Sequence, residues 1–392
     1  MPQALITRRG GDGYATVTFN LQDSISKVTS SLLYGDSRNN LAATTVGNYA
    51  IFGGGYTNNI TPSTSVDAYN TSLTESTPTA LSVARGGLAA TTVGNYALFG
   101  GGLGTNEGRL ATVDAYNTNL TRSNAGDLSQ SRGYLVATTV ENYALFGGGR
   151  DIYGDTVDAY NSSLTRTTPT SLSAARGFLA ATTVGNYALF GGGYDSGSRL
   201  STVDAYNASL TRSTPTSLSA ARNNLAATTV GNYALFGGGY GSSYSSVVDA
   251  YNTSLTRSTP TSLSASRNGL AATTVSNYAL FGGGYGSSYS SVVDAYNTSL
   301  TRSTPTSLSV ARDDLAATTA GNYALFGGGH SSHSYSSATD AYYYNAKTIQ
   351  LYPGTKYKFS NMSSEATSST MQEMTLSPPI IGYIKIKDAT IN

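Results

Sequence analysis

The chain has no cysteine and no tryptophan, and only 2 histidines among its 392 residues. Without cysteine it can form neither disulfides nor thiolate metal sites, although this absence says little about the compartment. The two histidines, His330 and His333, belong to one variable loop, and we expect them to be surface residues of that loop. We therefore expect no metal site and no cofactor.

Charged residues are also scarce. They make up 11% of the chain, and the formal net charge is +1 with no basic run, so the electrostatic footprint of a nucleic-acid-binding protein is missing. No apolar stretch approaches the ~18 residues of a membrane span, and residues 1–20 lack the apolar core of a secretory signal. We expect neither nucleic-acid binding nor membrane insertion, and no export by the usual signal peptide.

What the sequence has in abundance is repetition. Phe-Gly-Gly-Gly occurs seven times, at intervals of 47, 47, 44, 46, 45 and 45 residues. A period in this range indicates a stack of one supersecondary unit. The phenylalanines are Phe52, Phe99, Phe146, Phe190, Phe236, Phe281 and Phe326.

Each copy predicts four β-strands. In the sixth copy they are Leu270–Val275, Tyr278–Phe281, Val292–Tyr296 and Thr301–Ser309, joined by short turns. Small Ala and Thr side chains suit a first strand crowded around an axis, and proline places the fourth strand at an outer edge. Five copies carry that proline: Pro78, Pro169, Pro215, Pro260 and Pro305. Four strands in ~45 residues make one propeller blade, so we predict an all-β, seven-bladed propeller with small β extensions from both termini.

The repeat resembles the Kelch repeat over residues 38–345. The shared features are an apolar strand ending in glycines, then Val-Asp-Ala-Tyr-Asn, then an Arg before the next first strand. The tryptophan that Kelch repeats usually carry six residues after the Tyr is Glu75 in the first copy and Arg in the next five. We therefore expect different packing between blades. In Kelch domains that bind peptides, one end of the ring carries the ligand contacts. The resemblance implies that the corresponding end does so here.

The ends of the chain predict how the ring closes. The seventh copy lacks the fourth-strand pattern, and residues 26–37 resemble a degraded fourth strand, so we predict that an N-terminal strand completes the propeller of residues 23–346. The alternative is that Thr348–Tyr352 completes it. Residues 1–22 form an extension, and residues 347–392 form a β module with a hairpin of 348–352 and 356–359. The module is either a cap or a mount for attachment to a larger assembly.

Two places differ between copies that otherwise hardly vary. They are the pair after the repeat Arg and the loop after the triple Gly, and in an up-and-down blade both emerge on the same face. Their Tyr, Ser, Gly, Asn, Asp and His are favoured by the binding loops of antibodies. Drift of surface loops is the alternative, but the equally exposed turns of the opposite face scarcely vary. The candidate ligand-binding residues are Asn39, Asn40, Tyr56, Gly133, Tyr134, Tyr153, Phe178, Tyr194, Asn223, Asn224, Tyr240, Tyr244, Asn268, Tyr285, Tyr289, Asp313, Asp314, His330 and His333.

The variable residue types suggest how they arose. Asn, Asp, Gly, Ser, Tyr, His and Phe can all be reached from one Asn codon by changing its adenines, as expected of a diversity-generating retroelement. Residues 4–10 also resemble the start of some bacteriophage tail-associated proteins. We hypothesise a phage or prophage tail protein, in the virion or on an extracellular surface, that binds a host-surface protein or glycan. The termini would bind other virion or tail proteins, and homo-oligomers are common in such assemblies.

Catalytic patterns are missing. The sequence has no Ser-His-Asp constellation, HExxH motif or Walker loop, and the triple Gly precedes a loop and no helix. The seven repeat arginines are expected to pair with the Asp of each Val-Asp-Ala-Tyr, such as Asp294, because semi-buried charges need partners. Ligand contact by these arginines is the alternative. We predict a non-enzymatic binding protein, and the alternative function is a cytoplasmic Kelch scaffold for a partner protein.

Overall fold

The chain divides into two compact units, Ile25–Tyr343 and the combination of Met1–Ser24 with Tyr344–Asn392. The structure, a computed structural model, describes residues 5–7, 16–18, 24–28, 37–58, 60–149, 154–332, 334–345, 357–360 and 371–374. The predicted boundaries at residues 22 and 346 lie within three residues of this division.

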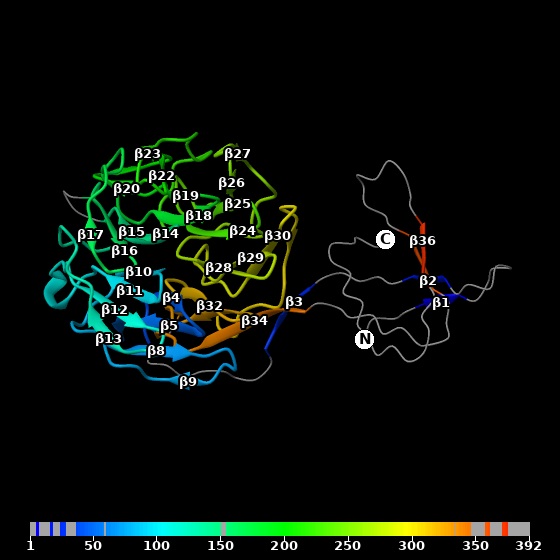
Figure 1. Ribbon diagram of the computed structural model, residues 1–392, viewed down its shortest axis with the longest axis horizontal. Helices are drawn as coiled ribbons and strands as arrows, with labels where there is room; N and C mark the ends of the chain where they lie inside the picture. Colours follow the sequence, from blue (N-terminus) through cyan, green and yellow to red (C-terminus); the bar gives the residue numbers. More distant parts are fainter. Residues whose placement is uncertain are drawn as a thin grey trace. The chain divides into compact units, whose positions relative to one another are not determined.

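The larger unit is a ring of seven four-stranded antiparallel sheets, which confirms the predicted seven-bladed propeller (Figure 1). The innermost strands are β4 (Ala42–Val46), β10 (Ala89–Val93), β14 (Val136–Val140), β18 (Ala180–Val184), β24 (Ala226–Val230), β28 (Ala271–Val275) and β32 (Ala316–Ala320). The second strands are β5 (Tyr49–Gly53), β11 (Tyr96–Gly100), β15 (Tyr143–Gly147), β19 (Tyr187–Gly191), β25 (Tyr233–Gly237), β29 (Tyr278–Gly282) and β33 (Tyr323–Gly327). The third strands are β8 (Val66–Tyr69), β12 (Val113–Asn117), β16 (Val157–Asn161), β22 (Val203–Asn207), β26 (Val248–Asn252), β30 (Val293–Asn297) and β34 (Thr339–Asn345). The outer strands are β9 (Glu75–Ser76), β13 (Arg122–Asn124), β17 (Arg166–Thr167), β23 (Arg212–Ser213), β27 (Arg257–Ser258), β31 (Arg302–Ser303) and β3 (Ser24–Lys27).

The Phe of each triple-glycine motif packs between blades. A Cβ added to Gly53 would lie only 2.8 Å from Cε1 of Phe99 in the next blade, so the first glycine makes room for the neighbouring ring. Phe99 meets Tyr116 of its own blade edge to face, with ring centroids 5.8 Å apart. Phe52 occupies the same place against Gly327 of the seventh blade, which closes the circle.

The outer strands are much shorter than predicted. The predicted fourth strand Thr301–Ser309 is reduced to the two residues of β31, and Pro305 follows two residues later. Proline has no N–H to donate to a ladder, so the chain leaves the sheet before it. It then folds back and buries Leu308, whose N–H donates to the carbonyl of Ser291 at 2.8 Å. The prolines therefore end the outer strands and do not lie in them.

The repeat arginines are buried structural groups, as predicted. Nη2 of Arg85 donates to Oδ2 of Asp114 at 2.7 Å and to the carbonyl of Phe99 at 3.1 Å. The other carboxylate oxygen, Oδ1 of Asp114, accepts from Nη1 of Arg122 at 2.9 Å. The outer Arg therefore occupies the Kelch tryptophan position as the second cation on one buried Asp. Asp294, which was predicted to pair with a repeat Arg, is held by Arg267 with the same geometry, at 2.7 Å.

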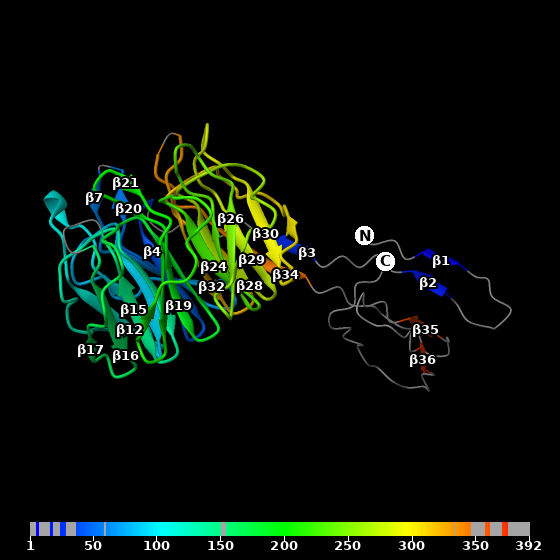
Figure 2. The same cartoon turned by 90° about the horizontal axis from the view of Figure 1, so that it is seen from above.

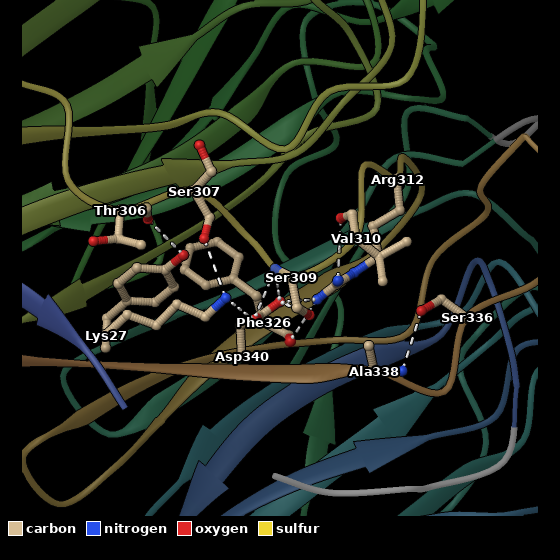
Figure 3. Close-up of polar contacts among 11 residues, drawn as sticks. Lys27, Thr306, Ser307, Ser309, Val310, Arg312, Phe326, Ser336, Ala338 and Asp340 are labelled. Atoms are coloured by element: carbon tan, nitrogen blue, oxygen red, sulfur yellow. Dashed lines mark hydrogen bonds and ion pairs between the residues drawn. The ribbon is translucent and has the colours of Figure 1, made fainter. Parts of the chain in front are cut away.

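The seventh blade is completed by β3, which confirms the predicted N-terminal closure (Figure 1). Nζ of Lys27 lies 2.6 Å from Oδ1 of Asp340, while Arg312 holds Oδ2 at 2.9 Å (Figure 3). Lys27 therefore replaces the outer Arg that the second to sixth blades carry. The closing strand starts two residues earlier than predicted, and the alternative strand 348–352 lies outside the described residues.

Several short elements complete the structure. The hairpins β6–β7 (Tyr56–Thr57, Thr61–Pro62) and β20–β21 (Tyr194–Asp195, Ser198–Arg199) stand on one side of the disc, and the 3₁₀ turn η1 spans Thr105–Glu107 (Figure 2). In the smaller unit, β1 (Leu5–Thr7) pairs with β2 (Thr16–Thr18), and β35 (Tyr357–Ser360) with β36 (Met371–Met374). The strand β36 was not predicted, and the predicted partner of β35, residues 348–352, lies outside the described residues.

Candidate binding face

The two variable segments of each copy lie side by side on one face. The N–H of Asn39 donates to the carbonyl of Tyr56 at 3.1 Å, and the N–H of Tyr56 donates back at 2.9 Å. The same pairing recurs in Gly86–Leu103, Gly177–Tyr194, Asn223–Tyr240, Asn268–Tyr285 and Asp313–His330. Topology had predicted a shared face, and the structure shows direct backbone contact in the six copies that it describes here.

The second residues of the variable pairs form a closed circle that we call the mouth ring. Each member donates its backbone N–H to the carbonyl of its counterpart in the preceding blade, at 2.8 to 3.2 Å, and the first member donates to the last. The members are Asn40, Gly87, Tyr134, Phe178, Asn224, Gly269 and Asp314. Because the ring is built from backbone bonds, its frame does not depend on which side chain a blade supplies.

All seven members of the mouth ring have a left-handed backbone, with φ between 48° and 61°. Asn, Asp and Gly tolerate this region, but it is unusual for bulky side chains. Tyr134 and Phe178 nevertheless adopt it, both at φ 55°. Their rings stack with centroids 4.5 Å apart and planes inclined by 32°. Strained backbone of this kind is concentrated at functional sites.

The mouth ring surrounds a central cavity of about 240 Å³. Its lining also includes the leucine that follows each ring member, a set that we call the leucine floor: Leu41, Leu88, Leu135, Leu179, Leu225, Leu270 and Leu315. The leucines are constant and the ring members are variable. The cavity lining therefore combines constant leucines with ring members of five residue types.

A row of aromatic side chains, the aromatic arc, crosses the loops of the last three blades. Successive ring centroids lie 5.0 to 5.8 Å apart, mostly edge to face. The arc consists of Tyr240, Tyr244, Tyr285, Tyr289, His330 and Tyr335. The guanidinium of Arg199 extends it, 4.7 Å from the ring centroid of Tyr240. Aromatic rings supply a large contact area at low entropy cost.

Polar groups at the end of the arc do not form a catalytic relay. The hydroxyl of Tyr289 lies 2.8 Å from Nδ1 of His330, and Oδ1 of Asp313 lies 3.7 Å from the same nitrogen. A general base needs its orienting group on the other ring nitrogen. Burial, and then the neighbouring Asp314, raise the pKa of Asp313 to about 7. Burial also raises the pKa of Asp314.

Most predicted site residues meet on this face, but some are not placed. Tyr153 and His333 lie outside the described residues. Gly133 has no room for a side chain, because a Cβ there would lie 2.7 Å from Cδ2 of Leu103. Sequence reasoning missed Tyr335, Arg199, the leucine floor, and the Gly87 and Gly269 members of the ring. The sequence did contain a signal for the left-handed backbone of the mouth ring, since Asn, Asp or Gly occupies its positions in all but two copies.

Two negative findings apply to the described residues. They contain no group of His, Asp and Glu side chains that could hold a metal ion. No helix among them has the length and apolar character needed to cross a membrane.

These features define a Kelch-like seven-bladed propeller with one diversified face. No protein-family model and no curated protein matches the chain. A solved structure of YjhT, a Kelch-repeat protein, is similar, with a TM-score of 0.55 and 13% sequence identity over 70% of this chain and 99% of YjhT. At this identity the likeness shows the fold alone. The phage-tail setting inferred from the sequence stays a prediction.

Proposed function

We propose that the protein is a non-enzymatic binding protein, which recognises its ligand through the mouth ring and the aromatic arc. One observation carries this proposal: residues that vary between copies gather on a single face, on a frame of backbone hydrogen bonds that tolerates the variation. Natural binding scaffolds likewise carry variable loops on a rigid framework. The ligand that we propose is a host-surface protein or glycan.

The chemistry of the face supports recognition. It offers aromatic rings, hydroxyls, amides and two carboxyl groups around the central cavity, which is the composition of adaptable binding surfaces. The repeat Arg and Asp residues, by contrast, are buried as pairs within the blades. The repeat arginines are therefore not part of the proposed site.

The test is a measurement of binding to a glycan array and a peptide array, using the full chain. Replacing Tyr240, Tyr244, Tyr285 and Tyr289 together by Ala should abolish the array signal, while the melting temperature falls only modestly. A matched variant replaces four exposed serines of the opposite face, Ser163, Ser209, Ser254 and Ser299, by Ala and should bind normally. Array binding that survives the tyrosine replacements, or is lost with the serines, would contradict the proposed face.

A further inference from the structure

The side chains of the mouth ring are unevenly distributed. Its seven members are bonded in chain order and the circle closes, so Asp314 lies opposite the midpoint of the stacked pair Tyr134 and Phe178. Two glycines leave space for these groups. A Cβ on Gly87 would lie 3.1 Å from the ring of Tyr134, and one on Gly269 would lie 3.1 Å from Oδ1 of Asp314. The cavity thus has an aromatic side and an acidic side.

The acidic side has no cationic side chain in the cavity wall, although His330, which is not part of the wall, opposes the effect of burial on the pKa of Asp314. None of the residues that line the cavity is Lys, Arg or His. Oδ2 of Asp314 lies 3.4 Å from Nδ2 of Asn40, which is a long contact to a neutral amide. The nearest repeat arginines are engaged elsewhere, Arg38 with Asp67 and Arg312 with Asp340. A carboxylate in such a wall is poorly solvated, so a cationic partner would stabilise it.

We propose that the central cavity binds a small organic cation, a primary ammonium or guanidinium group on a short apolar stem. The head group would donate hydrogen bonds to the carboxylate of Asp314 and to the side-chain carbonyl of Asn40. The stem would lie against Tyr134, Phe178 and the leucine floor. This inference rests on the proposed function, because it names the ligand chemistry at the centre of the same face.

Three physical terms favour this ligand class. Hydrogen bonds between a cationic N–H and a carboxylate are about twice as strong as neutral ones. Aromatic faces attract cations and also bury an apolar stem. A volume of about 240 Å³ admits one small group and no folded chain. The cation could therefore be a free amine or a single Lys, Arg or amino-terminal group displayed by a polypeptide.

The test compares three probes of one shape, benzylamine, benzyl alcohol and benzoate, by calorimetry on the full chain in mildly alkaline buffer, which favours the carboxylate of Asp314 while benzylamine keeps its proton. Benzylamine should bind at least about tenfold more tightly than benzyl alcohol, since the charge-assisted bonds are lost with the alcohol. Benzoate should not bind. Peptides that carry lysine or acetyl-lysine, competed against benzylamine, distinguish a displayed side chain from a free amine.

The variants use residues that the ring already accepts. Asn occupies the position of Asp314 in two other copies, as Asn40 and Asn224, so Asp314→Asn should preserve the backbone ring and the melting temperature. It should weaken benzylamine at least about tenfold. Phe178→Asn should weaken it severalfold. Asp195→Asn, a carboxyl group of the β20–β21 hairpin that contacts Ser196, is the control and should leave binding unchanged.

The outcomes separate this inference from the proposed function. Equal binding of benzyl alcohol and benzylamine, or full binding to Asp314→Asn, would overturn the cation site. If the arrays show a ligand that depends on the aromatic arc while benzylamine does not bind, only the cation inference fails. If benzylamine binds as expected but no array signal depends on the arc, only the proposed function fails.

Discussion

Asp313 carries a carboxyl group of the variable face whose pKa is strongly raised. Burial and the adjacent Asp314 raise its pKa to about 7, and Nδ1 of His330 is 3.7 Å away. The equivalent residue is Asn39, Asn223 or Asn268 in three other copies. This position therefore accepts a neutral amide, and the charged form of the Asp313 carboxyl group destabilises the folded protein.

We predict that Asp313 makes stability fall as the pH rises. A raised pKa means that the folded protein binds the proton more tightly than the unfolded chain. The resulting stabilisation is complete below the unfolded pKa of about 4 and is lost as the pH rises through about 7. Asp313→Asn should flatten this dependence in urea unfolding measured across that range. An unchanged slope in the variant, with Asp195→Asn as control, would contradict the prediction.

Single residues also explain where the repeat departs from its own pattern. The first residue of the turn between the first and second strands is left-handed in every copy, and it is Gly in all but Glu141 and Ser276. At the glycine turns a Cβ would approach the next blade closely, as at Gly185, where it would lie 3.2 Å from Cγ2 of Thr253. The counterpart of Thr253 facing Glu141 is Ala208, which is smaller. At Glu141 the change from Gly therefore coincides with a smaller residue in the neighbouring blade.

At the scale of the blade, the recurring unit is one buried Asp between two cations. The inner cation is the repeat Arg, and the outer cation comes from the fourth strand or, in the seventh blade, from Lys27. The first blade departs from this arrangement, because Glu75 stands where the next five copies have Arg. Burial, and then Asp67, raise the pKa of Glu75. The first blade thus places two carboxyl groups where its neighbours place an ion pair.

We predict that Glu75→Arg stabilises the protein by about 1 kcal/mol at neutral pH, since it replaces like charges by a partly exposed ion pair. Urea unfolding would measure the change. The reciprocal variant Arg122→Glu should place the same unfavourable pair in the second blade and lower stability by a similar amount. A loss of stability in Glu75→Arg would show that the first blade has its own arrangement around Asp67.

At the scale of the whole molecule, the ring is closed by a strand from the opposite end of the domain. The N–H of Val28 donates to the carbonyl of Ala341 at 2.9 Å, so the ladder continues from β3 to β34. The two residues are far apart in the chain, and forming this contact carries a large entropy cost. The seventh blade is therefore where we expect the ring to open first.

We predict that a disulfide joining positions 28 and 341 stabilises the ring. The chain has no cysteine, so Val28→Cys with Ala341→Cys introduces the only thiols and no competing pair. The oxidised form should gain about 2–4 kcal/mol, seen as a higher Tm, and a reductant should remove the gain. If the oxidised and reduced forms melt together although the disulfide has formed, unfolding does not begin at this junction.

Much of the fold could be predicted because the repeat reports the same unit seven times. Ala-Ala-Thr-Thr strands, Phe before glycine and Arg paired with Asp each recur, so a local pattern becomes a global one. The outer strands were predicted too long because proline is compatible both with a place inside an edge strand and with the end of that strand. The cation role of Arg122 and its equivalents was missed, although Lys27 stands eleven residues before Arg38, much as Arg122 stands ten before Arg132.

For the candidate site, the sequence and the tertiary structure decided different things. Sequence alone determined the number of blades and the two variable segments, because these depend on period and on alternation of turns. It left two candidates for the closing strand, and the structure selected β3. Only the tertiary structure decided that seven residues from seven blades bond into one circle, and that Asp314 faces Tyr134 and Phe178 across it. Successive members of the mouth ring are about 45 residues apart in the chain, and the first and last members are much further apart. The circle of contacts exists only because the propeller closes.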